Sequence, residues 1–226
     1  MCGRFTQSSS FAEIAAALGV AQIVTEESRP RYNIAPTQDV AAVRETSGER
    51  ELRMLRWGLV PAWSKDVEIG SRLINARAET VTEKPSFREA FKRRRCLIPS
   101  EGFYEWKREG TRKQPYYFRM KDKRPFAFAG LWERWEGHGQ KVIETCTILT
   151  TEANEVLAPV HDRMPVIIAA EHYESWLDPH LSATERLLPL LRPYGAAEMT
   201  SFAVSVAVNS PRAEGAGLIA PFVNSQ

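Results

Sequence analysis

Cysteine and histidine are scarce in this 226-residue sequence, which limits its metal and disulfide chemistry. The three cysteines, Cys2, Cys96 and Cys146, form no CxxC pair, and the four histidines form no HxxxH pair. These spacings disfavour a disulfide framework and a zinc site. We therefore expect no metal and no other cofactor. Cys96 and Cys146 lie in apolar strand-like runs, so we expect both to be core residues.

Long apolar runs and phosphate-binding glycine motifs are also absent. No run of about 18 apolar residues marks a transmembrane helix, and residues 1–7 lack the apolar core of a signal peptide. We therefore expect a cytoplasmic protein that does not enter a membrane. Neither a Walker A motif nor a GxGxxG after a strand is present, which disfavours nucleotide-binding folds. The net charge of +2 excludes a histone-like polycation but leaves nucleic-acid binding open.

The composition and the placement of turn residues favour one domain over the whole chain, residues 1–226. Hydrophobic residues make up 43% of the sequence, which is enough for a sizeable core, and no internal repeat or low-complexity linker divides it. A capping box that starts at Ser10 predicts a helix over residues 11–18. A similar pattern at residues 86–89 predicts a second helix that runs into the basic residues 92–95.

Most of the remaining chain has β character. Short runs rich in β-branched and aromatic residues are separated by turn signals, and two short helices are predicted at residues 151–157 and 171–177. This pattern predicts an α+β fold built on a mostly antiparallel, barrel-like sheet with a few short peripheral helices. The predicted strands are residues 96–98, 103–107, 115–119, 126–131, 145–150, 165–169 and 202–208.

Cys2 is the first residue with a specific chemical interpretation. Removal of the initiator methionine would give Cys2 both a thiol and an α-amine, whose ordinary pKa values are about 8.5 and about 7.7–8.0. Such a 1,2-aminothiol reacts with an aldehyde: the amine forms a Schiff base, and the thiol then closes a five-membered thiazolidine ring. The alternative is that Cys2 is a small, semi-buried residue without a chemical role. Arg4 adds a cation able to hold a phosphate or a carboxylate.

Two segments with alternating polar residues supply candidate partners for Cys2. Asn75, Arg77 and Glu79 share one face if their segment is extended, although a lone asparagine more often makes a turn. Glu105 lies in an aromatic run, where burial would raise the pKa of its carboxyl group and make it a candidate acid or base. The alternative for Glu105 is a solvent-facing position in a hairpin.

Two further polar segments each leave two interpretations open. His161, followed by Asp162 and Arg163, could transfer a proton or contact a phosphate when charged. The alternative is a polar turn with a surface pair between Arg163 and Asp162. The basic run at residues 92–95 suits either a solvated helix end, where cations complement the helix dipole, or a patch that attracts phosphate.

Seven short motifs follow one another along most of the chain. They are Met-Cys-Gly-Arg-Phe at 1–5, Arg-Tyr-Asn-Ile-Ala-Pro at 31–36, Arg-Trp-Gly-Leu-Val-Pro at 56–61, Leu-Ile-Asn-Ala-Arg-Ala-Glu-Thr at 73–80, Arg-Cys-Leu-Ile-Pro at 95–99, Gly-Phe-Tyr-Glu-Trp at 102–106 and His-Asp-Arg-Met-Pro at 161–165. Each motif alone is weak, but the ordered set with cysteine at position 2 is specific. This set resembles the SRAP family, the SOS response-associated peptidases that process abasic sites.

The resemblance implies a protein that binds single-stranded DNA and forms a reversible covalent thiazolidine with the aldehyde of an abasic site. Cys2 would be the nucleophile after Met1 is removed, and Asn75 would position it. Glu105 and His161 would move protons, and His161 would also steady the lesion phosphate. The DNA-binding residues implied by the resemblance are Arg4 and Arg77 at the backbone, Trp63 as a stacking aromatic and Pro36 against the bases.

The resemblance also implies a single α+β domain with a barrel-like core. We expect a monomer that binds neither membrane nor metal and, in a bacterium, joins the nucleoid during DNA damage. Glu101 replaces an aspartate common in the family, and the segment after Val208 fits the family loosely, so we assign no catalytic role to that segment. We expect an enzyme for which peptidase (hydrolase) and lyase-type activities accompany the covalent capture. Two other functions stay open: an N-terminal-nucleophile cysteine peptidase, autoproteolytic or general, and a non-covalent single-stranded DNA-binding module.

Overall fold

The computed structural model describes residues 2–25, 29–137 and 142–222. Within these residues the strands form two sheets, and most neighbouring strands are antiparallel. The smaller sheet has the order β14-β9-β8-β1-β3. Its strands are β1 (Phe5–Gln7), β3 (Arg31–Ile34), β8 (Gly102–Glu109), β9 (Arg112–Met120) and β14 (Met199–Ala203).

The larger sheet curls into a barrel. Its strand order is β12-β11-β10-β7-β4-β5-β2, and an additional parallel pairing between β5 and β11 closes the ring β11-β10-β7-β4-β5. Two short strands, β13 and β6, attach to β10 and β11. The strands of this sheet are β2 (Gln22–Ile23), β4 (Asp39–Thr46), β5 (Glu49–Trp57), β6 (Asn75–Arg77), β7 (Arg95–Ser100), β10 (Phe126–Glu136), β11 (Val142–Glu152), β12 (Arg163–Pro165) and β13 (Ile167–Ile168).

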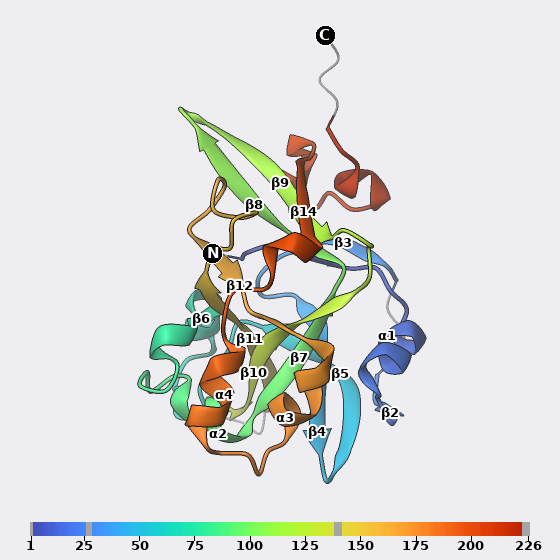
Figure 1. Ribbon diagram of the computed structural model, residues 1–226. Helices are drawn as coiled ribbons and strands as arrows, with labels where there is room; N and C mark the ends of the chain where they lie inside the picture. Colours follow the sequence, from blue (N-terminus) through green and yellow to red (C-terminus); the bar gives the residue numbers. More distant parts are fainter. Residues whose placement is uncertain (1, 26–28, 138–141, 223–226) are drawn as a thin grey trace.

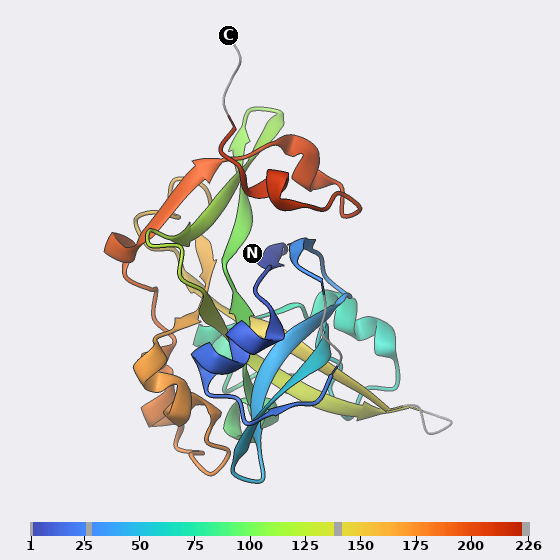
Figure 2. The same ribbon diagram turned by 90° about the vertical axis from the view of Figure 1, so that its right-hand side faces the viewer.

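Short helices cover one side of this barrel, while the other side meets the smaller sheet. The α-helices are α1 (Phe11–Leu18), α2 (Arg88–Arg93), α3 (Tyr173–Leu177) and α4 (Thr184–Leu187). Figure 1 shows α2, α3 and α4 at the lower end of the molecule and the β8–β9 hairpin projecting at the upper end. Figure 2 shows that the C-terminal segment lies at the same end as this hairpin.

Successive side chains along a strand point to opposite faces of the sheet, and this alternation divides the apolar core into two large clusters. In β7, Cys96 and Ile98 belong to the cluster shared with the smaller sheet, and Leu97 belongs to the cluster under the helices. The first cluster contains Cys2 and Phe5, so the start of the chain is part of the core that joins the two sheets. This arrangement confirms the predicted α+β fold with a mostly antiparallel, barrel-like core and short peripheral helices.

The first predicted helix is confirmed residue for residue. Helix α1 covers Phe11–Leu18, Ser10 and Glu13 form the reciprocal capping box, and Gly19 ends the helix in the left-handed conformation with φ of 63°. None of the helices in the described part of the chain is long and apolar enough to cross a bilayer. Cys96 and Cys146 are fully buried core residues, as expected.

The capping box predicted at residues 86–89 is wrong. Helix α2 begins at Arg88 after Phe87, which makes no side-chain capping bond. The backbone N–H groups of Phe87 and Arg88 both donate to the carbonyl of Lys84, at 2.9 Å each. Because this preceding turn already satisfies N–H groups at the start of the helix, the side chain of Ser86 is not needed as a cap.

Three other predictions need correction. Residues 151–157 form no helix, because the side chain of Asn154 accepts from the N–H groups of Val156 and Leu157 and closes a local turn. The run at 165–169 is split between β12 and β13. The strand predicted at 202–208 is displaced, since β14 ends at Ala203 and a 3-10 helix follows over Val206–Asn209.

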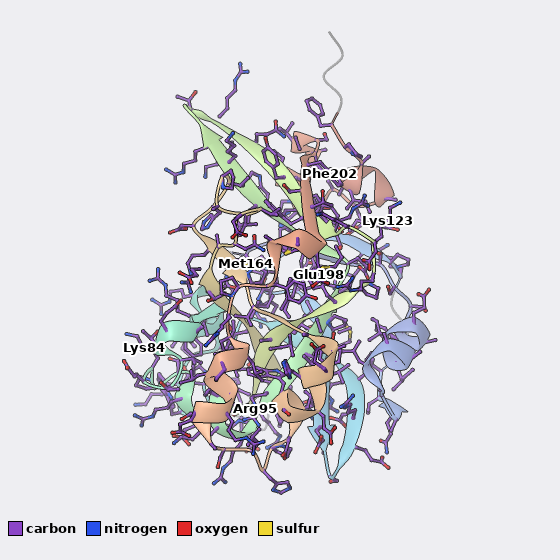
Figure 3. All side chains as sticks on the ribbon, in the orientation of Figure 1. Lys84, Arg95, Lys123, Met164, Glu198 and Phe202 are labelled. Atoms are coloured by element: carbon purple, nitrogen blue, oxygen red, sulfur yellow. The ribbon has the colours of Figure 1, made fainter. Side chains whose placement is uncertain are left out.

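Arg95, in the basic run at 92–95, holds the helical layer to the barrel. Its side chain is buried beneath α2 and α3, at the lower end of the molecule in Figure 3. Two neighbours in the run are also engaged within the protein, since Arg94 pairs with Glu133 at 2.7 Å and Lys92 with Glu89 at 3.4 Å. The guanidinium of Arg95 donates to the backbone carbonyls of Phe91, Lys92, Trp176, Asp178 and Leu181.

Replacing this guanidinium tests its structural role. We expect Arg95→Lys to lower the free energy of unfolding by about 2–4 kcal/mol, because an ammonium group cannot reach the same set of carbonyls and leaves some of them unsatisfied. Urea unfolding of the variant measures this loss. Arg93→Lys, at an exposed position of the same run, is the matched control and should change stability by less than about 0.5 kcal/mol. Equal effects of the two substitutions would contradict this assignment.

Candidate active site

Cys2 is fixed by a hydrogen bond from a distant part of the chain. Its side chain is fully buried, and its backbone carbonyl accepts from Asn75 Nδ2 at 2.8 Å. Asn75 opens β6, which pairs in parallel with β11 and places Asn75 opposite Ile148. The barrel therefore positions the side chain that holds Cys2.

The amide oxygen of Asn75 is a second feature of this contact. Its Oδ1 is buried and has no hydrogen-bond partner among the described residues. A buried amide oxygen without a donor is costly and commonly marks a functional position. Because the same amide group already contacts the Cys2 backbone, this oxygen is available to a donor at Cys2.

Glu105 is a buried carboxyl group on β8. Its neighbours alternate as predicted: Phe103 joins the core cluster that contains Cys2, while Tyr104 joins a separate cluster under the C-terminal segment. Only 3% of Glu105 is exposed, and burial raises the pKa of its carboxyl to about 7. Burial, with a smaller contribution from the charge of Glu105, raises the pKa of the Cys2 thiol well above its ordinary value.

His161 lies directly after the turn that Asn154 closes. Partial burial lowers the pKa of its imidazole, which favours the neutral ring at pH 7. Nδ1 lies 3.0 Å from the N–H of Arg163, which the neutral ring accepts with its proton on Nε2. The same nitrogen lies 2.9 Å from Asp162 Oδ1, an acceptor to which a protonated ring would donate. The contact with Arg163 therefore fits the neutral ring, and the contact with Asp162 fits the charged ring.

Glu105 and His161 line the same cavity, which has a volume of about 400 Å³. A volume of this size lies within the range of small-molecule sites. The structure thus brings together two residues that are 56 positions apart in sequence and that were both predicted as proton carriers. The remaining lining residues are Trp106, Arg108, Lys113 and Asn209.

Arg4 is partly committed to contacts within the protein. Its Nη1 donates to Asn33 Oδ1 at 2.7 Å and to the carbonyl of Val208 at 2.9 Å. Asn33 is almost fully buried and donates to the carbonyls of Ser210 and Ala213, which pins the C-terminal segment onto β3. Sequence reasoning missed Asn33, although it lies within the Arg-Tyr-Asn-Ile-Ala-Pro motif.

Asn209 is a second residue that sequence reasoning passed over. It follows Val208, in the segment to which no role was assigned, yet it lines the cavity and accepts from Trp106 Nε1 at 2.7 Å.

The polar segment at residues 161–163 does not form the surface pair between Arg163 and Asp162 that the sequence left open. Arg163 instead forms a bidentate pair with Glu79, at 2.7 and 2.9 Å.

The remaining predicted DNA-binding residues lie outside the cavity lining. Arg77 is exposed at the end of β6, and Pro36 is half-buried in the turn after β3. Trp63 is 60% exposed, with only a long contact of 3.5 Å from its indole N–H to the carbonyl of Pro85. Among the described residues, no group of three or more histidine, cysteine or acidic side chains is placed to hold a metal ion.

Comparisons with known proteins identify the family and the fold. A family model described as SOS response associated peptidase (SRAP) matches residues 1–211. The abasic site processing protein YoaM of Bacillus subtilis is 46% identical over 221 residues, covering 97% of both chains. The abasic site processing protein YedK of Escherichia coli is 30% identical over 228 residues, covering 98% of this chain and 100% of its own.

A solved structure shows the same fold. A protein from Bacteroides thetaiotaomicron superposes with a TM-score of 0.88 at 29% identity, covering 98% of this chain and 100% of that one. The chain belongs to the SRAP family, which confirms the resemblance seen in the ordered motifs.

The buried carboxyl group predicts a pH-dependent stability. The pKa of Glu105 is about 7 in the folded protein and about 4.3 in an unfolded chain, so the folded state binds more protons between these values. The contribution of Glu105 to the free energy of unfolding is complete below pH 4.3 and is lost as the pH rises through 7. Glutamine has no proton to lose, so the free energy of unfolding of Glu105→Gln lacks this pH dependence. Measured against the wild type, we expect the variant to gain on the order of 3 kcal/mol in stability between pH 5 and pH 8.5.

Urea unfolding at the two pH values measures this difference. The exposed residue Glu155 offers a matched control, since Glu155→Gln removes the same charge from the surface and should show little change between pH 5 and pH 8.5. A pH-independent effect of Glu105→Gln would contradict a buried carboxyl that titrates near neutrality.

Proposed function

We propose that this protein captures abasic sites in single-stranded DNA through a covalent bond to Cys2, after removal of Met1. The observation that carries the proposal is the hydrogen bond from Asn75 to the Cys2 carbonyl, beside a carboxyl group whose pKa is about 7. The names of the relatives support it, since YoaM and YedK are called abasic site processing proteins.

The first bond would form between the α-amine of Cys2 and C1′ of the ring-opened sugar. The amine adds to the aldehyde and gives a carbinolamine, which loses water to become an imine. This step needs a donor for the departing hydroxyl group and an acceptor for the proton of the amine. The open Oδ1 of Asn75 would accept from the amine and orient it.

Glu105 suits both proton transfers. A group with a pKa near the working pH is present in both its acid and its base form, which is the condition for efficient general acid–base catalysis. Glu105 would take a proton from the amine and return one to the hydroxyl that leaves as water. His161, neutral and carrying its proton on Nε2, would donate to the lesion phosphate or to the sugar oxygen.

The second bond would form between the Cys2 sulfur and the imine carbon. The thiol adds across the C=N bond, its proton passes to the nitrogen, and the five-membered thiazolidine closes without loss of any atom. Burial keeps the free thiol protonated, so it does not react before the imine is in place. Reversal would follow the same steps backwards, with water as the entering group.

The DNA strand would reach the site over cationic and aromatic groups on the surface. Arg77 is exposed two residues after Asn75, and Arg4 lies two residues after Cys2, so both suit contacts to the phosphate backbone. The exposed Trp63 would stack on a base, and Pro36 would pack against the bases. Such contacts favour an unpaired strand, whose bases are free to stack.

The proposal predicts a heat-stable adduct that depends on Cys2. Protein lacking Met1, incubated with a single-stranded oligonucleotide that carries one abasic site, should give a mass of protein plus DNA minus water. Cys2→Ala should give no heat-stable adduct, while weaker, salt-sensitive binding remains because the cationic contacts persist. Denaturing gels and intact mass measure both.

Cys2→Ser separates the two bonds. The serine variant keeps the α-amine but lacks the thiol, so borohydride should trap its imine while heat should destroy any untrapped product. A full yield of heat-stable adduct from Cys2→Ala would contradict the mechanism. Hydrolysis of peptides by the wild type, without any adduct, would instead favour a peptidase.

A further inference from the structure

The β8–β9 hairpin places two cations directly opposite each other. Arg108 on β8 pairs with Lys113 on β9 in the antiparallel register, close to the turn at Gly110. Paired residues of neighbouring strands point to the same face of a sheet, with Cβ atoms about 4.5–5.5 Å apart. Both side chains line the cavity that contains Glu105 and His161.

This juxtaposition is unfavourable without a counter-ion. Like charges directly opposite each other across two strands destabilise the pairing. Neither Arg108 nor Lys113 forms an ion pair or a side-chain hydrogen bond with another described residue. An anion bound between them would therefore gain two charged contacts and would relieve the repulsion between the two cations.

The other lining residues favour a phosphate as that anion. Trp106 donates its indole N–H to Asn209 Oδ1, which orients the Asn209 amide and leaves its N–H donors for another acceptor. An arginine fork, a lysine ammonium and an amide together offer the many donors that a phosphate group accepts. A cavity of about 400 Å³ has room for a sugar that carries a phosphate.

We propose that Arg108 and Lys113 form a phosphate-binding subsite, so that the cavity selects aldehydes that carry a phosphate group. Glu105 and His161 would serve the aldehyde, and the cation pair would hold the phosphate of the same molecule. Two sources supply this chemistry: a phosphate of the damaged strand, or the terminal phosphate of a free sugar. The selection of aldehydes rests on the proposed capture by Cys2, whereas the binding of phosphate does not.

Phosphate binding is tested first, without any covalent chemistry. Inorganic phosphate, compared with chloride at equal ionic strength, should raise the melting temperature of the wild type. Arg108→Gln/Lys113→Gln should lose this rise. The matched control, Arg112→Gln/Lys121→Gln, removes two cations at the opposite ends of β9 that do not line the cavity, and should keep the rise. An equal rise in all three proteins would overturn the subsite.

Selectivity is tested with two small aldehydes and protein that lacks Met1. Capture of glyceraldehyde 3-phosphate or glyceraldehyde adds the mass of the aldehyde minus water, as the imine and thiazolidine steps require. The wild type should capture the phosphorylated aldehyde about tenfold faster or more, as expected for one charge-assisted hydrogen bond. This ratio should fall towards 1 in Arg108→Gln/Lys113→Gln and should persist in the control variant.

An abasic oligonucleotide distinguishes the two phosphate sources. Slower capture of this DNA by Arg108→Gln/Lys113→Gln supports a subsite for a strand phosphate. Unchanged DNA capture, with the preference for glyceraldehyde 3-phosphate lost, supports a subsite for free phosphorylated aldehydes. If the wild type captures abasic DNA but does not prefer glyceraldehyde 3-phosphate to glyceraldehyde, the phosphate subsite is overturned and the capture by Cys2 is not. Absence of any adduct, with the melting shift intact, overturns the capture by Cys2 and not the phosphate binding.

Discussion

The parallel pairing of β5 with β11 is the constraint on which the rest of the molecule depends. It closes the five-stranded ring where Cys146 lies opposite Trp57. Trp57 then donates its indole N–H to the carbonyl of Ile74 at 2.8 Å, which fixes the residue directly before Asn75. Because β6 continues along β11 in the same direction, the amide of Asn75 faces the start of the chain. The contact with Cys2 is therefore a consequence of how the barrel closes.

Burial is the common cause of the chemical properties of the site. It is the largest influence on the pKa values of Cys2, Glu105 and His161, raising the first two and lowering the third. A close approach makes this burial possible at β8, since a Cβ atom at Gly102 would lie 2.3 Å from the ring of Tyr117. Only glycine lets β8 begin there, and the strand then carries Glu105 inward. Burial on β8, in the smaller sheet, is thus the main cause of the raised pKa of the Glu105 carboxyl, ahead of any neighbouring charge.

Two local signals in the sequence predicted local structure correctly, whereas the capping pattern at residues 86–89 and the helical pattern at 151–157 did not. The capping box at Ser10 and the alternation around Glu105 both depend on residues a few positions apart, and the structure confirms both. Strands β4 and β5 were missed because their residues mix charges with apolar positions, and the buried Arg44 is paired with Glu51 and Glu144. Glu51 lies opposite Arg44 in the β4–β5 hairpin, but Glu144 is 100 residues away, so no local pattern reveals that partner.

The same limit applies to the C-terminal wall of the cavity. The carbonyl of Val208 accepts from Arg4 and, at 3.4 Å, from Asn33, so one backbone oxygen joins the residue before β1, strand β3 and the C-terminal segment. The hydrogen bonds of Arg4 to Asn33 and to Val208 both use Nη1. The next residue, Asn209, binds Trp106 and borders the cavity. The C-terminal segment thus binds the guanidinium of Arg4, two residues after Cys2, and forms one wall of the cavity, although it carries none of the expected chemistry.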